Sequence, residues 1–135
     1  MDIISRIKRE SNNLLKVLKY LPHTYGNCSY DLSYLKNKKS PVIFRCTTKK
    51  PKKIYLEDLA DMINDKTEQD LGNIGVFTNK KELHTQKETS KLYILLMPES
   101  SLNKEEKLQV LEQEIIKIRS IVQEYLYIHF NIKPE

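Results

Sequence analysis

The feature that most constrains the fold of this chain is a regular apolar stripe near its C-terminal end. Apolar and aromatic residues recur there at spacings of three and four, which is the period of one face of an α-helix. The stripe consists of Leu108, Leu111, Ile115, Ile118, Val122, Tyr125 and His129. It predicts a long amphipathic helix over residues 100–131, with Ser100 or Ser101 as its N-cap and acidic residues in its first turn.

This helix could serve two purposes. Three heptads of strict spacing favour association with another helix. The residues of such a partner interface would be Leu108, Leu111, Ile115, Ile118, Val122 and Tyr125. Further apolar residues on other sides, among them Ile116, Ile121 and Leu126, favour packing inside the chain. We expect part of the helix to pack on a sheet and part to meet a protein partner or a second copy of the chain.

A second helical pattern begins the chain. Residues 2–21 place Ile4, Ile7, Leu14 and Leu18 at helical spacing, and a proline at position 22 ends the pattern. The polar residues 11–13 interrupt it. Because serine and asparagine compete for local backbone hydrogen bonds, the interruption predicts a bend or a restart with Ser11 as the N-cap.

The patterns between these two helices predict strands and one short helix. Alternation over residues 28–34 and 42–48, joined by the turn KNKKSP, predicts an antiparallel hairpin. Residues 74–78 predict a further strand, and the continuous apolar run at 91–98 is typical of a buried central strand. Residues 56–65 predict a short helix that starts with two acids, Glu57 and Asp58. Residues 79–91 have no sustained period and are expected to form a mobile loop.

These patterns together predict an α+β fold in one domain, residues 1–135. The expected architecture is an antiparallel sheet of about four strands with an N-terminal helix, a short middle helix and a long amphipathic C-terminal helix. A hydrophobic fraction of 39% and a charged fraction of 30% suit a folded chain. No apolar stretch reaches the ~20 residues that cross a bilayer, and the start of the chain lacks the apolar centre of a signal peptide. We expect a cytoplasmic or nuclear protein, neither secreted nor membrane-bound.

The charges are unevenly divided along the chain. Residues 1–55, the basic helix-plus-hairpin part, contain 13 Lys and Arg against 3 acids, a net charge of +10. The remaining residues contain 10 against 15, a net charge of −5. Such asymmetry favours contact with a polyanion, but it also arises when one half of a chain pairs electrostatically with the other half or with a second subunit.

Most of the basic residues cluster around the predicted hairpin. The predicted polyanion-binding residues are Lys36, Lys38, Lys39, Arg45, Lys49, Lys50, Lys52 and Lys53, with Tyr25 and Tyr55 as candidates for stacking on bases. Two other interpretations stay open. The lysines could serve only solubility, and the segment KKPKK at residues 49–53 is also typical of a nuclear localisation signal.

No motif predicts catalysis or a cofactor. The three histidines are not part of any nucleophile–base motif, and the three glycines form neither a P-loop nor a dinucleotide fingerprint. Cys28 and Cys46 lack zinc spacing and are expected to be buried thiols rather than metal or redox residues. We expect no enzymatic activity, no cofactor, no metal and no small-molecule substrate.

The segment VIFRCTTKKPKKIYL, residues 42–56, has an apolar strand, a basic loop and a second apolar stretch. In this order, and with a helix before it, the chain resembles the small Alu-domain subunits of the signal recognition particle. The resemblance covers about residues 14–63, and that family's fold leaves no place for residues 70–135.

Two functions follow as expectations. The first is a non-enzymatic binding or assembly subunit that contacts nucleic acid, RNA or DNA, or another acidic surface through its basic hairpin region. The second is a protein–protein adaptor that dimerises, or docks onto a larger complex, through the C-terminal heptads.

Overall fold

The computed structural model of the chain describes residues 1–22, 24, 27–37, 39–48, 53–67, 72–78 and 90–134, of which 48, 53–55, 72–78 and 90 are described by their backbone alone. The described helices and strands are α1 (Ile3–Leu18), β1 (Cys28–Asp31), the 3-10 helix η1 (Ser33–Leu35), β2 (Val42–Thr48), α2 (Lys53–Thr67), β3 (Gly72–Thr78), β4 (Ser90–Pro98) and α3 (Lys104–Phe130). The predicted α+β class, with an antiparallel sheet and three helices, is confirmed.

The described strands form one sheet in the order β1-β2-β4-β3, and all neighbouring strands are antiparallel. The hairpin predicted from residues 28–48 is the β1–β2 pair. The apolar run of β4 lies between β2 and β3, as expected for a central strand. Within the described part of the chain, no helix is both long and apolar enough to cross a membrane.

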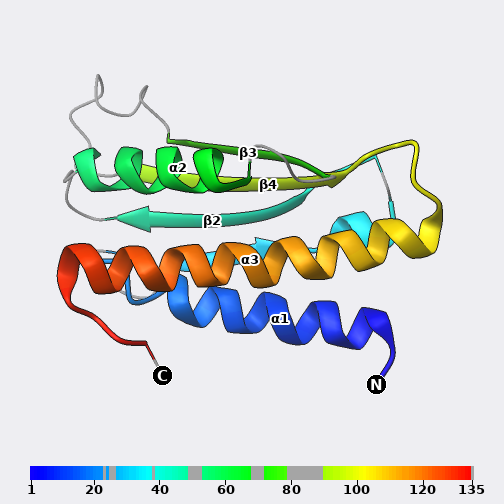
Figure 1. Cartoon of the computed structure of the whole chain (residues 1–135), viewed down its shortest axis with the longest axis horizontal. Coiled ribbons are helices and arrows are strands. Elements are labelled where there is room, and N and C mark those ends of the chain that lie inside the picture. Colours follow the sequence, from blue (N-terminus) through cyan, green and yellow to red (C-terminus); the bar gives the residue numbers. More distant parts are fainter. Residues whose placement is uncertain are drawn as a thin grey trace.

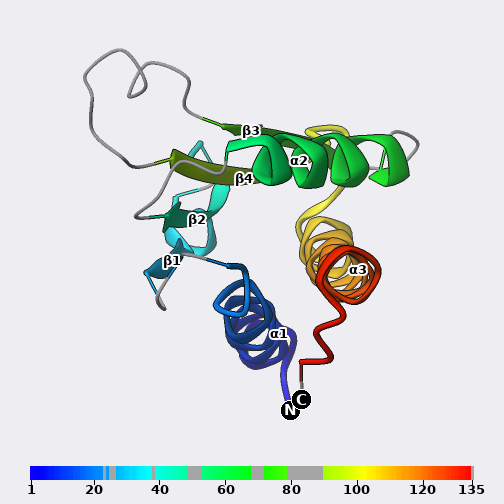
Figure 2. The ribbon, with the colours of Figure 1, turned by 90° about the vertical axis from the view of Figure 1, so that its left-hand side faces the viewer.

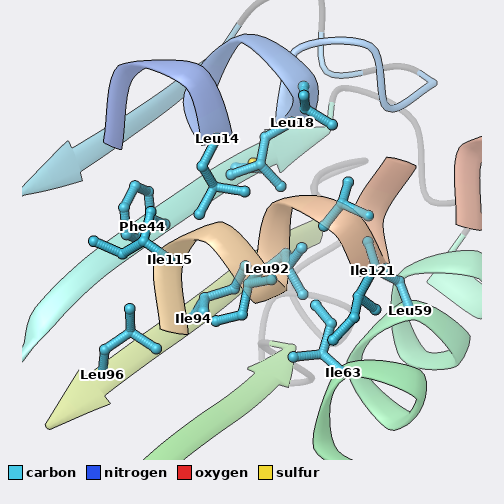
Figure 3. Close-up of a cluster of buried hydrophobic side chains, with 14 of the residues drawn as sticks. Leu14, Leu18, Phe44, Leu59, Ile63, Leu92, Ile94, Leu96, Ile115 and Ile121 are labelled. Atoms are coloured by element: carbon cyan, nitrogen blue, oxygen red, sulfur yellow. The ribbon is translucent and has the colours of Figure 1, made fainter. Parts of the chain in front are cut away.

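The three helices cover the same face of the sheet. Figure 2 shows α1 nearest β1, α2 nearest β3, and α3 between them. Side chains on the inner face of the sheet, such as Phe44 and Ile94, meet Leu14 of α1, Leu59 of α2 and Ile115 of α3 in a single cluster (Figure 3). Alternate positions of β2 and β4 point away from the helices and remain at least partly exposed. This alternation explains the period of two that the sequence shows in β2.

Helices α1 and α3 lie side by side and run in the same direction (Figure 1). Two ion pairs link them. Arg6 Nε lies 2.7 Å from Glu112 Oε2, and Arg119 Nη1 lies 2.7 Å from Glu10 Oε2. The N-terminal positive charge is therefore partly used inside the chain, which is one of the two explanations that the charge asymmetry allowed.

Several predicted boundaries are wrong because side-chain caps and turns decide them. The first helix is continuous through residues 11–13, and its N-cap is Asp2, not Ser11. The N-cap of α3 is Asn103, not Ser100 or Ser101. The Asn103 side chain accepts from the Glu106 backbone N–H at 2.8 Å and forms a capping box that the predicted cap could not complete.

Three further boundaries differ from the predictions. The strand expected over residues 28–34 ends at Asp31, where the chain turns into η1. Helix α2 begins at Lys53 instead of residue 56, so Glu57 and Asp58 lie beyond its first turn and do not balance its N-terminus. Strand β4 begins at residue 90, which was expected in the loop, one residue before the predicted run at 91–98. Residues 79–89 of that expected loop lie outside the described residues.

Candidate polyanion-binding groove

The predicted basic residues fall into two groups in the structure. Lys36, Lys39 and Arg45 are described and exposed. Lys53 and Tyr55 belong to the first turn of α2, where only the backbone is described. The remaining predicted residues, which are Lys38, Lys49, Lys50, Lys52 and Tyr25, lie outside the described residues.

Two of the exposed predicted residues line one open groove of about 680 Å³ at the β1 edge of the sheet. We call it the basic groove. It is lined by Ile4 and Lys8 of α1, by Tyr30 and Asp31 of β1, by Leu32, by Ser33, Leu35 and Lys36 at η1, and by Arg45 of β2. Lys39 does not line it. Lys8, which the sequence analysis did not single out, adds a third cation.

The turn after β1 places Lys36 at the groove. The Asp31 carboxylate accepts a hydrogen bond from the Ser33 backbone N–H at 2.7 Å and another from Ser33 Oγ at 2.5 Å. This Asx-type turn stops the strand and starts η1. The Lys36 N–H then donates to the Ser33 carbonyl at 2.9 Å, which ends η1 with Lys36 exposed.

The same hydrogen bonds affect the ionisation of Asp31, the one acidic residue among the described residues that line the groove. Donation by the Ser33 hydroxyl and backbone N–H, and to a smaller extent the nearby charge of Arg45, lower the pKa of Asp31. Asp31 is therefore ionised at neutral pH. The described lining also contains the three cations Lys8, Lys36 and Arg45, so the net charge of this lining is positive.

These three cations form no ion pair with any residue that the structure describes. This distinguishes them from Arg6, Arg9 and Arg119, whose guanidinium groups contact Glu112 or Glu10 and hold α1 to α3 or to itself. Cations that are already paired with carboxylates contribute little to an approaching anion. Among the described residues, the groove therefore contains basic side chains that are not held in an ion pair with a carboxylate.

Apolar groups line the groove between its charges. Ile4, Leu32 and Leu35 contribute aliphatic surface, and Tyr30 contributes an aromatic ring. That ring is held firmly, because it stacks on Phe44 with centroids 5.8 Å apart and its hydroxyl donates to Asn12 Oδ1 at 2.8 Å. Among the described side chains, Tyr30 is the tyrosine that lines the groove. Tyr25 and the side chain of Tyr55, the two predicted stacking candidates, lie outside the described residues.

The predicted partner interface lies inside the chain's own core. Leu108, Leu111, Ile115, Ile118, Val122 and Tyr125 have exposed fractions between 0% and 8%. They belong to the same buried cluster as residues of α1, α2 and the sheet, as the extra apolar faces of the helix allowed. Figure 3 shows Ile115 within this cluster. The large apolar side chains that α3 does expose are Tyr127 and Ile128, at 51% and 60%, near its C-terminal end.

Within the described residues, no group of three or more His, Cys, Asp or Glu side chains is placed to hold a metal ion. Comparisons with protein-family models, with curated proteins and with solved structures found no match to this chain.

Proposed function

We propose that this chain is a non-enzymatic binding subunit that holds a single-stranded nucleic acid in the basic groove. One observation carries this function: the groove combines three cations that have no ion-pair partner in the described structure with an apolar and aromatic lining. Lysine and arginine bind phosphate oxygens and release counterions. The lining adds a surface on which a base or sugar can lie.

The mixed character of the groove favours a single strand over other anions. A bare phosphate would use the cations but leave Ile4, Leu35 and the Tyr30 ring uncovered. A duplex presents its phosphates outward but keeps its bases stacked inside. A single strand exposes both phosphates and base faces. The groove, at about 680 Å³, lies within the usual size range of small-molecule sites, so it is large enough for a nucleotide.

The test is a salt titration of binding to fluorescent single-stranded RNA and DNA of mixed sequence, read by anisotropy. We expect Lys8→Gln, Lys36→Gln and Arg45→Gln each to weaken binding at low salt by roughly fivefold, which corresponds to about 1 kcal/mol. Each should also flatten the slope of log affinity against log salt by about 0.7 per lost phosphate contact.

Matched variants separate the groove from general charge. Lys16→Gln removes the same charge from an exposed position of α1 outside the groove, and Lys104→Gln does so at the start of α3. Both should leave affinity nearly unchanged. Ile4→Ser should weaken binding without changing the salt slope, because it removes apolar contact and no charge.

Asp31→Asn should act in the opposite direction. It removes the negative charge of the groove, and the amide oxygen can still accept the hydrogen bonds from Ser33. We expect tighter binding. Equal losses for the groove and control variants would contradict a defined groove, and no binding by the unaltered protein at low salt would exclude the function.

In that last case the adaptor function would become the leading candidate. An association through α3 would have to use exposed residues, of which Tyr127 and Ile128 are the large apolar ones. Light scattering would then show a mass above that of the 16.0 kDa chain, and Ile128→Glu should return it to the monomer value.

A further inference from the structure

Cys28 and Cys46 lie directly opposite each other in the β1–β2 pair, although 17 residues separate them along the chain. The sequence spacing gave no reason to expect a shared role. Cys46 is 1% exposed on the inner face of the sheet, and Cys28, on the edge strand, is partly exposed. Both are free thiols in this structure.

The hydrogen-bond pattern identifies the kind of pair. The Thr47 backbone N–H donates to the Asn27 carbonyl at 3.0 Å, one position beyond the cysteines in the same register. Positions 27 and 47 are therefore a hydrogen-bonded pair. Since the two kinds of pair alternate along an antiparallel ladder, Cys28 and Cys46 form a non-hydrogen-bonded pair, in which the Cα atoms approach to about 4.5 Å. That separation lies within the range of about 4.4–6.8 Å over which a disulfide can form.

The two thiols have different chemical characters. A hydrogen bond with Cys46 lowers the pKa of Cys28, and the charge of Lys19 and a bond with Thr24 act in the same direction. The same hydrogen bond between the two thiols, together with burial, raises the pKa of Cys46. Cys28 is thus the more acidic and more accessible sulfur, which suits a nucleophile, and Cys46 is placed behind it as a resolving thiol.

We propose that Cys28 and Cys46 are a redox modification site that forms a reversible cross-strand disulfide by exchange with a low-molecular-weight disulfide. The Cys28 thiolate attacks one sulfur of the oxidant, whose S–S bond breaks and releases one thiolate. That thiolate takes the proton of Cys46. The Cys46 sulfur then attacks Cys28 Sγ, the mixed disulfide breaks, and a second small thiolate leaves. It takes a proton from water in place of the one that Cys28 released on ionising. The protein loses two electrons and two protons in all, and the oxidant becomes two thiols.

The bond would close a loop over residues 28–46. This loop carries η1, Lys36 and Arg45, so it includes one wall of the basic groove. It also joins the four-residue edge strand β1 covalently to β2, its one neighbour among the described strands. Cross-linking should therefore raise the thermal midpoint of unfolding, by on the order of 10 °C for a loop of this size.

The test incubates the native protein with glutathione disulfide, blocks remaining thiols with an alkylating reagent, and maps the peptides by mass spectrometry. We expect a Cys28–Cys46 cross-linked peptide, a protein mass lower by two hydrogens, and full recovery of two alkylatable thiols after dithiothreitol. The thermal midpoint should be higher for the oxidised form than for the reduced one.

Two variants check the order of attack. Cys46→Ala removes the resolving sulfur and should trap one glutathione on Cys28, whereas Cys28→Ser should leave the buried Cys46 unmodified. The peptide map of the unaltered protein stands even if a variant fails to fold. Accumulation of a stable mixed disulfide on Cys28 of the unaltered protein, or no reaction of either thiol while the fold is intact, would overturn the proposal.

Discussion

Ser11 is a polar residue that is buried on α1. The sequence marks it as a break in the apolar pattern, but α1 runs through it without interruption. Its side chain is fully buried, and among the described residues its Oγ has no hydrogen-bond partner. A buried hydroxyl without a partner loses its hydration and gains nothing in return.

We therefore expect Ser11→Ala to stabilise the protein. The free energy of unfolding should rise by about 0.5–1.5 kcal/mol, from relief of the unsatisfied hydroxyl and from higher helix propensity. Urea denaturation measures this. The control Ser120→Ala, at an exposed position of α3, gains helix propensity alone and should have the smaller effect. Destabilisation by Ser11→Ala would show that the hydroxyl is bonded in solution.

The fold opposes the ionisation of Tyr125. Burial, with a smaller contribution from the negative charge of Asp58, raises its pKa from 10.0 to about 12. The unfolded chain would ionise this phenol near its ordinary pKa, while the folded protein keeps it neutral. The contribution of the neutral Tyr125 phenol to the free energy of unfolding is thus fully present below pH 10. It is lost as the pH rises towards 12.

Tyr125→Phe should make stability less dependent on pH in this alkaline window. Phenylalanine keeps the ring in the core but has no proton to lose. The measurement is the urea midpoint of both proteins at neutral pH and at steps between pH 10 and 12. If the two proteins lose stability in parallel across these steps, Tyr125 is not the residue responsible.

The two ends of α3 show that local backbone chemistry, not the apolar stripe, decides where a helix stops. At the start, Asn103 and Glu106 satisfy each other's backbone N–H groups. At the end, Asn131 adopts the left-handed conformation with φ 54°, and the Ile132 N–H donates to the Leu126 carbonyl at 3.1 Å. Asparagine tolerates this conformation better than most residues.

Loss of the N-terminal cap should destabilise the protein measurably. For Asn103→Ala we expect the free energy of unfolding to fall by about 0.5–2 kcal/mol, because the Glu106 N–H loses its acceptor. Ser100→Ala and Ser101→Ala are the controls and should change stability little. A larger loss of stability for either serine variant would mean that this serine, as the sequence pattern predicted, is the N-cap in solution.

The molecule as a whole is held together by contacts between its two ends. Glu10 of α1 and Arg119 of α3 lie 109 positions apart in the chain, yet their charged atoms are 2.7 Å apart. Lys66 Nζ and Glu124 Oε2, which link α2 to α3, are also 2.7 Å apart. The two pairs differ in burial: side-chain exposure is 26% and 9% in the first pair but 42% and 47% in the second.

Burial should decide how much each ion pair contributes to the free energy of unfolding. A double-mutant cycle on Glu10 and Arg119 is expected to give a coupling energy of about 1–3 kcal/mol, because the surrounding protein screens the charges less than water does. The same cycle on Lys66 and Glu124 should give about 0–1 kcal/mol. Equal coupling energies would mean that burial does not control these interactions.

The local patterns of the sequence were sufficient to predict the α-helices and the strands, but not the 3-10 helix η1 and not the site. The hairpin and the three helices follow from periods of two and of three to four, because those periods report which side of an element is apolar. The central strand follows from its continuous apolar run. Lys8 and Tyr30 were missed as groove residues because no local pattern says that α1 will lie beside η1. Lys36 and Arg45 were found because their charge alone marked them.

The sequence by itself determined the fold class, the order of the elements and the apolar faces that had to be buried. Only the tertiary structure decided what covers those faces: the heptad side chains of α3 pack inside the chain, with α1, α2 and the sheet around them. It also decided which cations are paired with carboxylates and that Cys28 faces Cys46. The physical reason is that a periodic pattern relates a residue to its own neighbours along the chain, whereas charge pairing and strand register depend on surfaces brought together from distant positions.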